Sequence, residues 1–144
     1  MILVTGASGH FGKATIDFLL KKNIPPRNIT AMVRDVAKAE DLKNKGINLK
    51  IGDYDNYLGM VSVFKGIDKL FLISSNDLVK RGKQQENAVN AAKEAGVKHI
   101  IFTSFERKNE TQTSPIAMLA TAYIETEKLI RGSGIDYTGV GKQE

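Results

Sequence analysis

The sequence repeats one joint four times: a polar, helix-like stretch ends in a glycine, and a β-branched residue follows at once. The joints are Gly46-Ile47, Gly66-Ile67, Gly96-Val97 and Gly134-Ile135. A glycine just past a helix accepts the left-handed conformation that closes the last turn, and Ile or Val then starts a pleated, buried segment. Each joint therefore predicts a helix that leads directly into a strand.

Six short segments that are largely apolar alternate with these helix-like stretches. Such a composition is typical of strands that are buried on both faces. The expected strands are Ile2–Thr5, Ile29–Val33, Ile47–Ile51, Leu70–Ser74, Ile100–Thr103 and Ile135–Thr138. Strands that alternate with helices predict a parallel sheet with right-handed crossovers on both faces, which is a doubly wound α/β domain.

Two of the expected helices carry clear signals. Lys83–Ala95 places alanines at positions 88, 91, 92 and 95, and this stripe of small residues lets a helix lie close to a sheet. Ser114 followed by Pro115 is typical of an N-cap and a first helical residue, and the inward stripe that follows continues up to Gly132.

A glycine-rich stretch, VTGASGHFGK, follows the first expected strand. Ligands of doubly wound sheets bind beyond the carboxyl ends of the strands. Gly6 is expected to make the tight turn, Gly9 to let a pyrophosphate approach the backbone, and Gly12 to let the helix pack on the sheet. The helix start would add free N–H groups and a partial positive charge. The residues predicted to bind a cofactor here are Gly6, Ser8, Gly9, His10, Phe11 and Gly12; a glycine-rich turn without a ligand is the alternative.

The second expected strand ends in AMVRD, about twenty residues beyond the glycines, where the adenosine ribose is expected. An acidic residue at this point would bind the 2′-hydroxyl of NAD, whereas a guanidinium pairs with the 2′-phosphate of NADP. Arg34 therefore favours NADP over NAD, with Lys38 as a second cation. The alternatives are that Arg34 is a solvated surface residue and that Asp35 caps the next helix.

Several other classes of function find little support. The chain has no cysteine and no apolar run near the roughly 20 residues that span a bilayer, and no signal-peptide pattern follows Met1, so we expect a cytoplasmic protein without a membrane segment. The net charge of +5 is spread among acidic residues, which does not indicate nucleic-acid binding. His10 and His99 are the only histidines and are expected to lie far apart, so no metal site is predicted.

Two sequence motifs of common enzyme classes are missing. Gly12-Lys13 is followed by Ala14, and no glycine stands at position 7, so the chain does not spell a P-loop. Ser133 lies between Gly132 and Gly134 without the outer pattern of a serine-hydrolase nucleophile elbow.

Six stretches together resemble the atypical short-chain dehydrogenase/reductases, above all the NmrA-like NAD(P)H:quinone oxidoreductases and triphenylmethane reductases. They are VTGASGHFG, AMVRD, GDYDN, KLFLISS, AAKEAGVKHIIFTS and SPIAMLATAYIETEKLIRGSGIDYT. The resemblance implies a Rossmann domain that holds NADPH, with Asp53 and Tyr54 near the adenine and with Ser74 and Thr103 along the path to the nicotinamide. It also implies hydride transfer to a quinone or a similar flat, electron-poor acceptor.

The catalytic pair Tyr-x-x-x-Lys of short-chain dehydrogenases is absent. The residues four positions after the four tyrosines are Leu58, Val61, Glu127 and Gly141. A tyrosine acid assisted by a lysine is therefore not available, which suits an acceptor that needs less help from a proton donor. Tyr123 is the remaining catalytic candidate, and a core aromatic on the last helix is the alternative interpretation.

The resemblance covers residues 1–138, which we expect to form the NAD(P)-binding domain, with 139–144 as a short divergent tail. Members of the group continue into a C-terminal substrate domain, so the nicotinamide half of the site is expected to be open to water here. Three hypotheses stay open: an NADPH-dependent quinone reductase, a non-catalytic NAD(P)-sensing module, and an inactive fragment of a longer chain. Exposed apolar surface leaves self-association into a homo-oligomer open as well.

Overall fold

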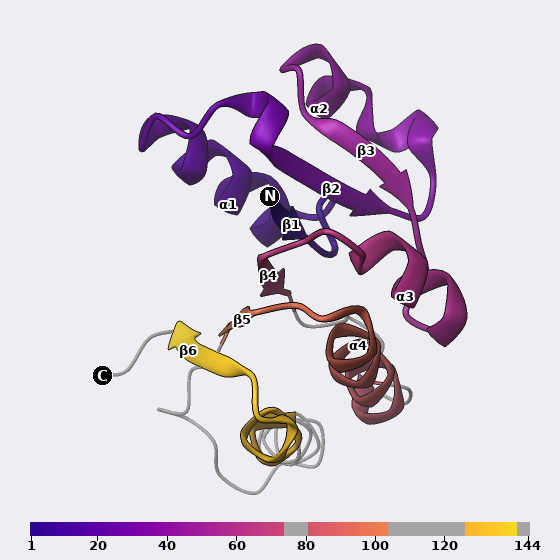
Figure 1. The fold of residues 1–144 in the computed structure, drawn as a ribbon. Coiled ribbons are helices and arrows are strands. Elements are labelled where there is room, and N and C mark those ends of the chain that lie inside the picture. The colour runs from indigo at the N-terminus through magenta and orange to yellow at the C-terminus, as the bar shows by residue number, and fades with distance from the viewer. Residues whose placement is uncertain (74–80, 104–125, 141–144) are drawn as a thin grey trace, which may run out of the picture.

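The computed structural model describes residues 1–73, 81–103 and 126–140, and its elements follow the expected alternation of strands and helices (Figure 1). In chain order they are β1 (Ile2–Val4), α1 (His10–Lys21), η1 (Pro26–Asn28), β2 (Ile29–Val33), η2 (Val36–Ala39), α2 (Glu40–Asn44), β3 (Asn48–Ile51), α3 (Tyr57–Phe64), β4 (Lys69–Leu72), α4 (Arg81–Ala95), β5 (His99–Thr103) and β6 (Asp136–Val140). Residues 126–133 are also helical.

The strands form one parallel sheet in the order β3-β2-β1-β4-β5-β6. The chain first builds outward from β1 to β3 and then returns to place β4 on the other side of β1. The predicted doubly wound α/β domain is confirmed, and the strand order is that of the Rossmann fold. Its switch point, where ligands bind in such sheets, lies between β1 and β4.

The sheet separates two hydrophobic cores. Leu3 of β1 belongs to the core beneath α3 and α4, whereas Val4 belongs to the core beneath α1 and α2, because successive strand residues point to opposite faces. Figure 1 shows α1 on one side of the sheet and α3 with α4 on the other. The predicted alanine stripe is confirmed: Ala88, Ala91 and Ala92 of α4 are fully buried in the first core.

All four glycine joints adopt the predicted left-handed conformation, with φ between +81° and +86°. Four expected strands nevertheless start at a different residue, the sixth at Asp136 rather than Ile135. Ile47 N–H donates to Leu42 O and so still closes α2, which is why β3 begins at Asn48 rather than Ile47. β4 begins at Lys69 and ends at Leu72, and β5 begins at His99, because β4 and β5 pair from these two residues onward.

The sixth strand also differs from its expected bounds. β6 runs from Asp136 to Val140, whereas the prediction ended it at Thr138, because Phe102 and Thr103 of β5 supply pairing positions for two further residues. The helix start predicted at Ser114 lies outside the described residues.

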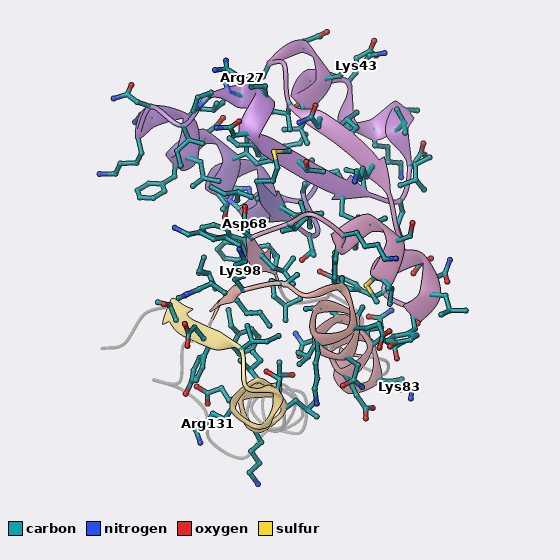
Figure 2. The ribbon with its side chains drawn as sticks, viewed as in Figure 1. Arg27, Lys43, Asp68, Lys83, Lys98 and Arg131 are labelled. Carbon is teal, nitrogen blue, oxygen red and sulfur yellow. The ribbon has the colours of Figure 1, made fainter. Side chains whose placement is uncertain are left out.

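A charged cluster marks the edge of the sheet where β4 and β5 begin. Asp68 binds the amino group of Met1 at 2.8 Å and Lys98 at 3.7 Å. Figure 2 shows Asp68 and Lys98 side by side at this edge. The strands run parallel, so the glycine-rich turn after β1 lies at the opposite edge.

Candidate dinucleotide-binding site

The three glycines after β1 have distinct structural roles. Gly6 has a φ of +57°, which a glycine adopts without strain, and it turns the chain out of the strand. A Cβ atom at Gly12 would lie 2.2 Å from Gly6 O and 2.6 Å from Ala7 Cα, so only glycine fits there. At Gly9 a Cβ atom would make only an ordinary 3.5 Å contact with Gly6 O. The turn therefore needs glycine at positions 6 and 12 for its own geometry, but not at position 9.

The start of α1 presents backbone N–H groups to solvent. Gly9 is the N-cap; no side chain of the described residues caps the helix, and its first turn contains no acidic residue. His10 and Phe11 are exposed, and their rings meet edge to face with 5.9 Å between centroids. A helix start in this condition carries a partial positive charge that can accept an anion.

Two ion pairs fasten α1 to α2. Lys13 Nζ lies 3.1 Å from Asp41 Oδ2, and Lys45 Nζ lies 2.7 Å from Asp17 Oδ1. The hydrogen bond from Lys13 lowers the pKa of the Asp41 carboxyl below its ordinary value. Because Lys13 follows Gly12 directly, the first of these pairs also holds the glycine-rich turn against its neighbouring helix.

The carboxyl end of β2 presents the predicted cations. Arg34 and Lys38 are exposed, and neither forms an ion pair with another described residue. Asp35 caps η2, because its Oδ1 accepts from Ala37 N–H at 3.0 Å. The sequence offered Asp35 as the cap of the helix through Glu40 and Lys45; it caps the 3-10 helix η2 that precedes this helix, and the N-cap of α2 is Ala39. Arg34 remains the cation directly at this strand end.

A compact turn follows β3 and carries Asp53 and Tyr54. Asp53 Oδ1 accepts from Asp55 N–H at 2.9 Å, which shapes the turn. A Cβ atom at Gly52 would lie 2.6 Å from Met32 Sδ, so the turn starts against the buried end of β2. Gly52 is a site residue that was not predicted from the sequence, and its place directly after an expected strand was the available signal.

Tyr54 reaches from this turn to the ends of β1 and β4. Its hydroxyl lies 2.7 Å from Thr5 Oγ1 and 2.5 Å from Ile73 O. It also lies 3.7 Å from the position that a Cβ atom would take at Gly6. Thr5 is fully buried, and sequence analysis did not identify it as a site residue. Its signal was a polar residue that follows three apolar strand positions and precedes the first glycine.

All predicted site residues that the structure describes lie at this edge. Most of these residues follow the ends of β1, β2 and β3: the glycine turn, Arg34, Lys38, Asp53 and Tyr54. Thr103 ends β5 on the same edge, where its backbone pairs with Val140. The remaining two predicted site residues, at positions 74 and 123, lie outside the described residues.

Within the described ranges, no three His, Cys, Asp or Glu side chains lie close enough together to hold a metal ion. No described helix is both long and apolar enough to cross a membrane.

Comparison with known proteins supports the same kind of site. The chain is 44% identical over 138 residues to quinone oxidoreductase 2 of Escherichia coli, covering 96% of this chain and 46% of that protein. The crystal structure of the NADPH-dependent quinone oxidoreductase QOR2 of E. coli complexed with NADPH matches with a TM-score of 0.87 and 41% identity, over 96% of this chain and 47% of the other.

A second solved relative is the triphenylmethane reductase of Citrobacter sp. complexed with NADP(H). It matches with a TM-score of 0.86 and 39% identity, over 96% of this chain and 48% of the other. The chain thus spans about half the length of the relatives that it matches. The model of the NmrA-like family matches residues 1–141. The chain with this glycine turn and this strand order therefore belongs to the NmrA-like family.

Proposed function

We propose that the chain binds NADPH and serves as the cofactor-binding part of an oxidoreductase that transfers hydride to a quinone or a similar planar acceptor. The observation that carries the proposal is the glycine turn at the end of β1, which leads into an α-helix start without a side-chain cap. This turn lies beside the switch point of the sheet, where doubly wound domains bind dinucleotides.

The geometry at Gly9 fits a phosphate ligand. The protein itself would tolerate a Cβ atom there, so packing does not explain the glycine. A pyrophosphate that approaches the exposed helix start would need this space, and the N–H groups of the first turn would donate to its oxygens. Ser8 is half-buried in the same turn and would add a hydroxyl donor.

The remaining predicted residues fall into two groups, one for each half of the cofactor. Arg34 and Lys38 would bind the 2′-phosphate, since both are exposed cations without an ion-pair partner among the described residues. Asp53 would lie near the adenine, and Thr103 on the nicotinamide side. The same side would include Ser74, with Tyr123 as the candidate catalytic residue. NADPH, when bound, supplies the hydride; the chain's own residues bind and orient it.

The names of the relatives support the proposed kind of acceptor. Their names describe reductases of quinones, triphenylmethane dyes and, for a protein of Xenophilus azovorans that is 34% identical over 105 residues, azo compounds. These acceptors are conjugated and electron-poor. A non-catalytic NAD(P)-binding module is the second candidate, and the absence of a Tyr-x-x-x-Lys pair favours it.

Calorimetric titration with NADPH and NADH tests the proposal. We expect the wild-type chain to bind NADPH at least about tenfold more tightly than NADH, because a guanidinium–phosphate pair contributes roughly 1.5–3 kcal/mol. Arg34→Ala should remove the preference. Arg27→Ala is the matched control, because Arg27 is exposed at the opposite end of β2 (Figure 2).

Gly9→Ala separates binding from folding. The contact at 3.5 Å predicts no clash, so the free energy of unfolding should fall by only about 1 kcal/mol, which is the cost of Ala as a much poorer N-cap than Gly. NADPH binding should be lost. Absence of NADPH binding by the wild-type chain would refute the proposal. Binding without NADPH oxidation in the presence of a quinone would favour the second candidate.

A further inference from the structure

The hydroxyl of Tyr54 lies where the ladder between β1 and β4 ends, and we infer that it bridges these two strand ends and so positions the nicotinamide half of the dinucleotide. This inference rests on the proposed NADPH site. It gives the phenol a different role from the adenine contact that the family resemblance implies for Tyr54.

The ladder changes its hydrogen-bond pattern at Thr5. Thr5 N–H donates to Phe71 O at 3.1 Å, as a parallel ladder requires. The next bond of such a ladder would join Ile73 N–H to the carbonyl of Thr5. Ile73 N–H donates to Thr5 Oγ1 instead, at 2.9 Å. A side-chain oxygen thus takes the place of a backbone carbonyl, and the regular backbone ladder between β1 and β4 ends here.

Tyr54 lies across the place where the ladder between β1 and β4 ends, on the face of the sheet that α3 and α4 cover. Its hydroxyl lies 2.7 Å from Thr5 Oγ1 and 2.5 Å from Ile73 O, so one oxygen touches both strand ends. The phenol has a single proton, and because a carbonyl oxygen can only accept, that proton goes to Ile73 O, while the Thr5 hydroxyl can donate to the phenol oxygen. Asn87 of α4 donates to the Tyr54 carbonyl at 2.9 Å and fixes the backbone that carries the ring.

The position of this bridge relates it to one half of the ligand. A dinucleotide crosses a doubly wound sheet at the switch point, which here lies between β1 and β4. Arg34 lies at the end of β2, so the adenosine half would extend over β2 and β3, and the nicotinamide half over β4 and β5. The distance between Thr5 and Ile73 therefore affects how the nicotinamide half sits relative to the glycine turn, but does not affect the adenosine half.

Two ligands and two variants test the inference. Tyr54→Phe should weaken NADPH binding about fivefold, the equivalent of one neutral hydrogen bond, and should change the affinity for 2′,5′-ADP by less than about twofold. Thr5→Val, which removes the other hydroxyl of the bridge, should show the same selective loss. Tyr57→Phe is the matched control, because Tyr57 is half-buried on α3 and its hydroxyl forms no hydrogen bond with the described residues.

Hydrogen exchange supplies a readout without any ligand. Tyr54→Phe should speed exchange of the Ile73 amide, which donates to Thr5 Oγ1, while Tyr57→Phe should leave it unchanged. Equal weakening of NADPH and 2′,5′-ADP would show that Tyr54 contacts the adenosine half and would overturn the inference, as would unchanged NADPH affinity. If the wild-type chain binds neither ligand, the proposed function fails, and an unchanged exchange rate at Ile73 then overturns the bridge itself.

Discussion

Replacing Gly12 with alanine should destabilise the fold because of a clash with backbone atoms. The new Cβ atom would lie 2.2 Å from Gly6 O and 2.6 Å from Ala7 Cα. Overpacking costs about 1–3 kcal/mol, and a clash with backbone, which cannot rotate away, belongs at the upper end of that range. Alanine regains about 1 kcal/mol as a better helix former than glycine. The net loss is therefore about 2 kcal/mol, or about 8 °C in Tm for a chain of this size.

Urea unfolding followed by circular dichroism measures this loss. Gly82→Ala is the control, because a Cβ atom at this exposed position of α4 would meet nothing within 4 Å. It should raise the free energy of unfolding by about 0.5–1 kcal/mol through helix propensity alone. A Gly12→Ala chain as stable as wild type would refute the packing argument. It would mean that α1 can move away from the turn at little cost.

Two further perturbations test buried and charged contacts. Gln85→Met should leave the free energy of unfolding within about 1 kcal/mol of wild type. The substitution loses the hydrogen bond that Thr126 donates to Gln85, but it also removes a buried amide nitrogen that has no partner among the described residues, and the two effects offset each other. A loss above about 3 kcal/mol in urea unfolding would contradict this. Asp41→Asn should lower stability at neutral pH. The folded-state pKa of Asp41 is depressed by Lys13, so the stabilisation is present above the unfolded pKa near 4 and disappears as pH falls through the folded value. Urea midpoints of both chains should therefore converge at low pH, and a constant difference would exclude Lys13 as the cause.

The fold followed from local signals that act over a few residues. A glycine past a helix end has one favourable conformation, so Gly46, Gly66, Gly96 and Gly134 could be assigned correctly without knowledge of the rest of the chain. Strand starts were less predictable. Whether Ile47 N–H closes the helix or joins the sheet depends on Leu42 O, and the sequence pattern shows only that Ile47 is apolar.

Residues of the candidate site were predictable from the sequence where their role depends on the conformation or close packing of their own backbone. Gly6 and Gly12 have the turn and the close packing that their spacing indicated. Thr5 and Gly52 were missed, because their roles depend on groups distant in sequence: Thr5 meets Tyr54 and Ile73, and Gly52 meets Met32. Only the assembled sheet brings these groups together.

The central position of β1 has a consequence for folding during synthesis. β1 pairs with β2 on one edge and with β4 on the other, but β4 starts only at Lys69, about 65 residues after Val4. Ribosomes synthesise about 5–20 residues per second, so roughly 3–13 s pass between the synthesis of β1 and the start of β4. During this time the edge of β1 that later pairs with β4 has no partner strand. A nascent chain in which β1, β2 and β3 have already paired would therefore expose an apolar, unpaired strand edge. Aggregation of the nascent chain should depend on how quickly β4 arrives.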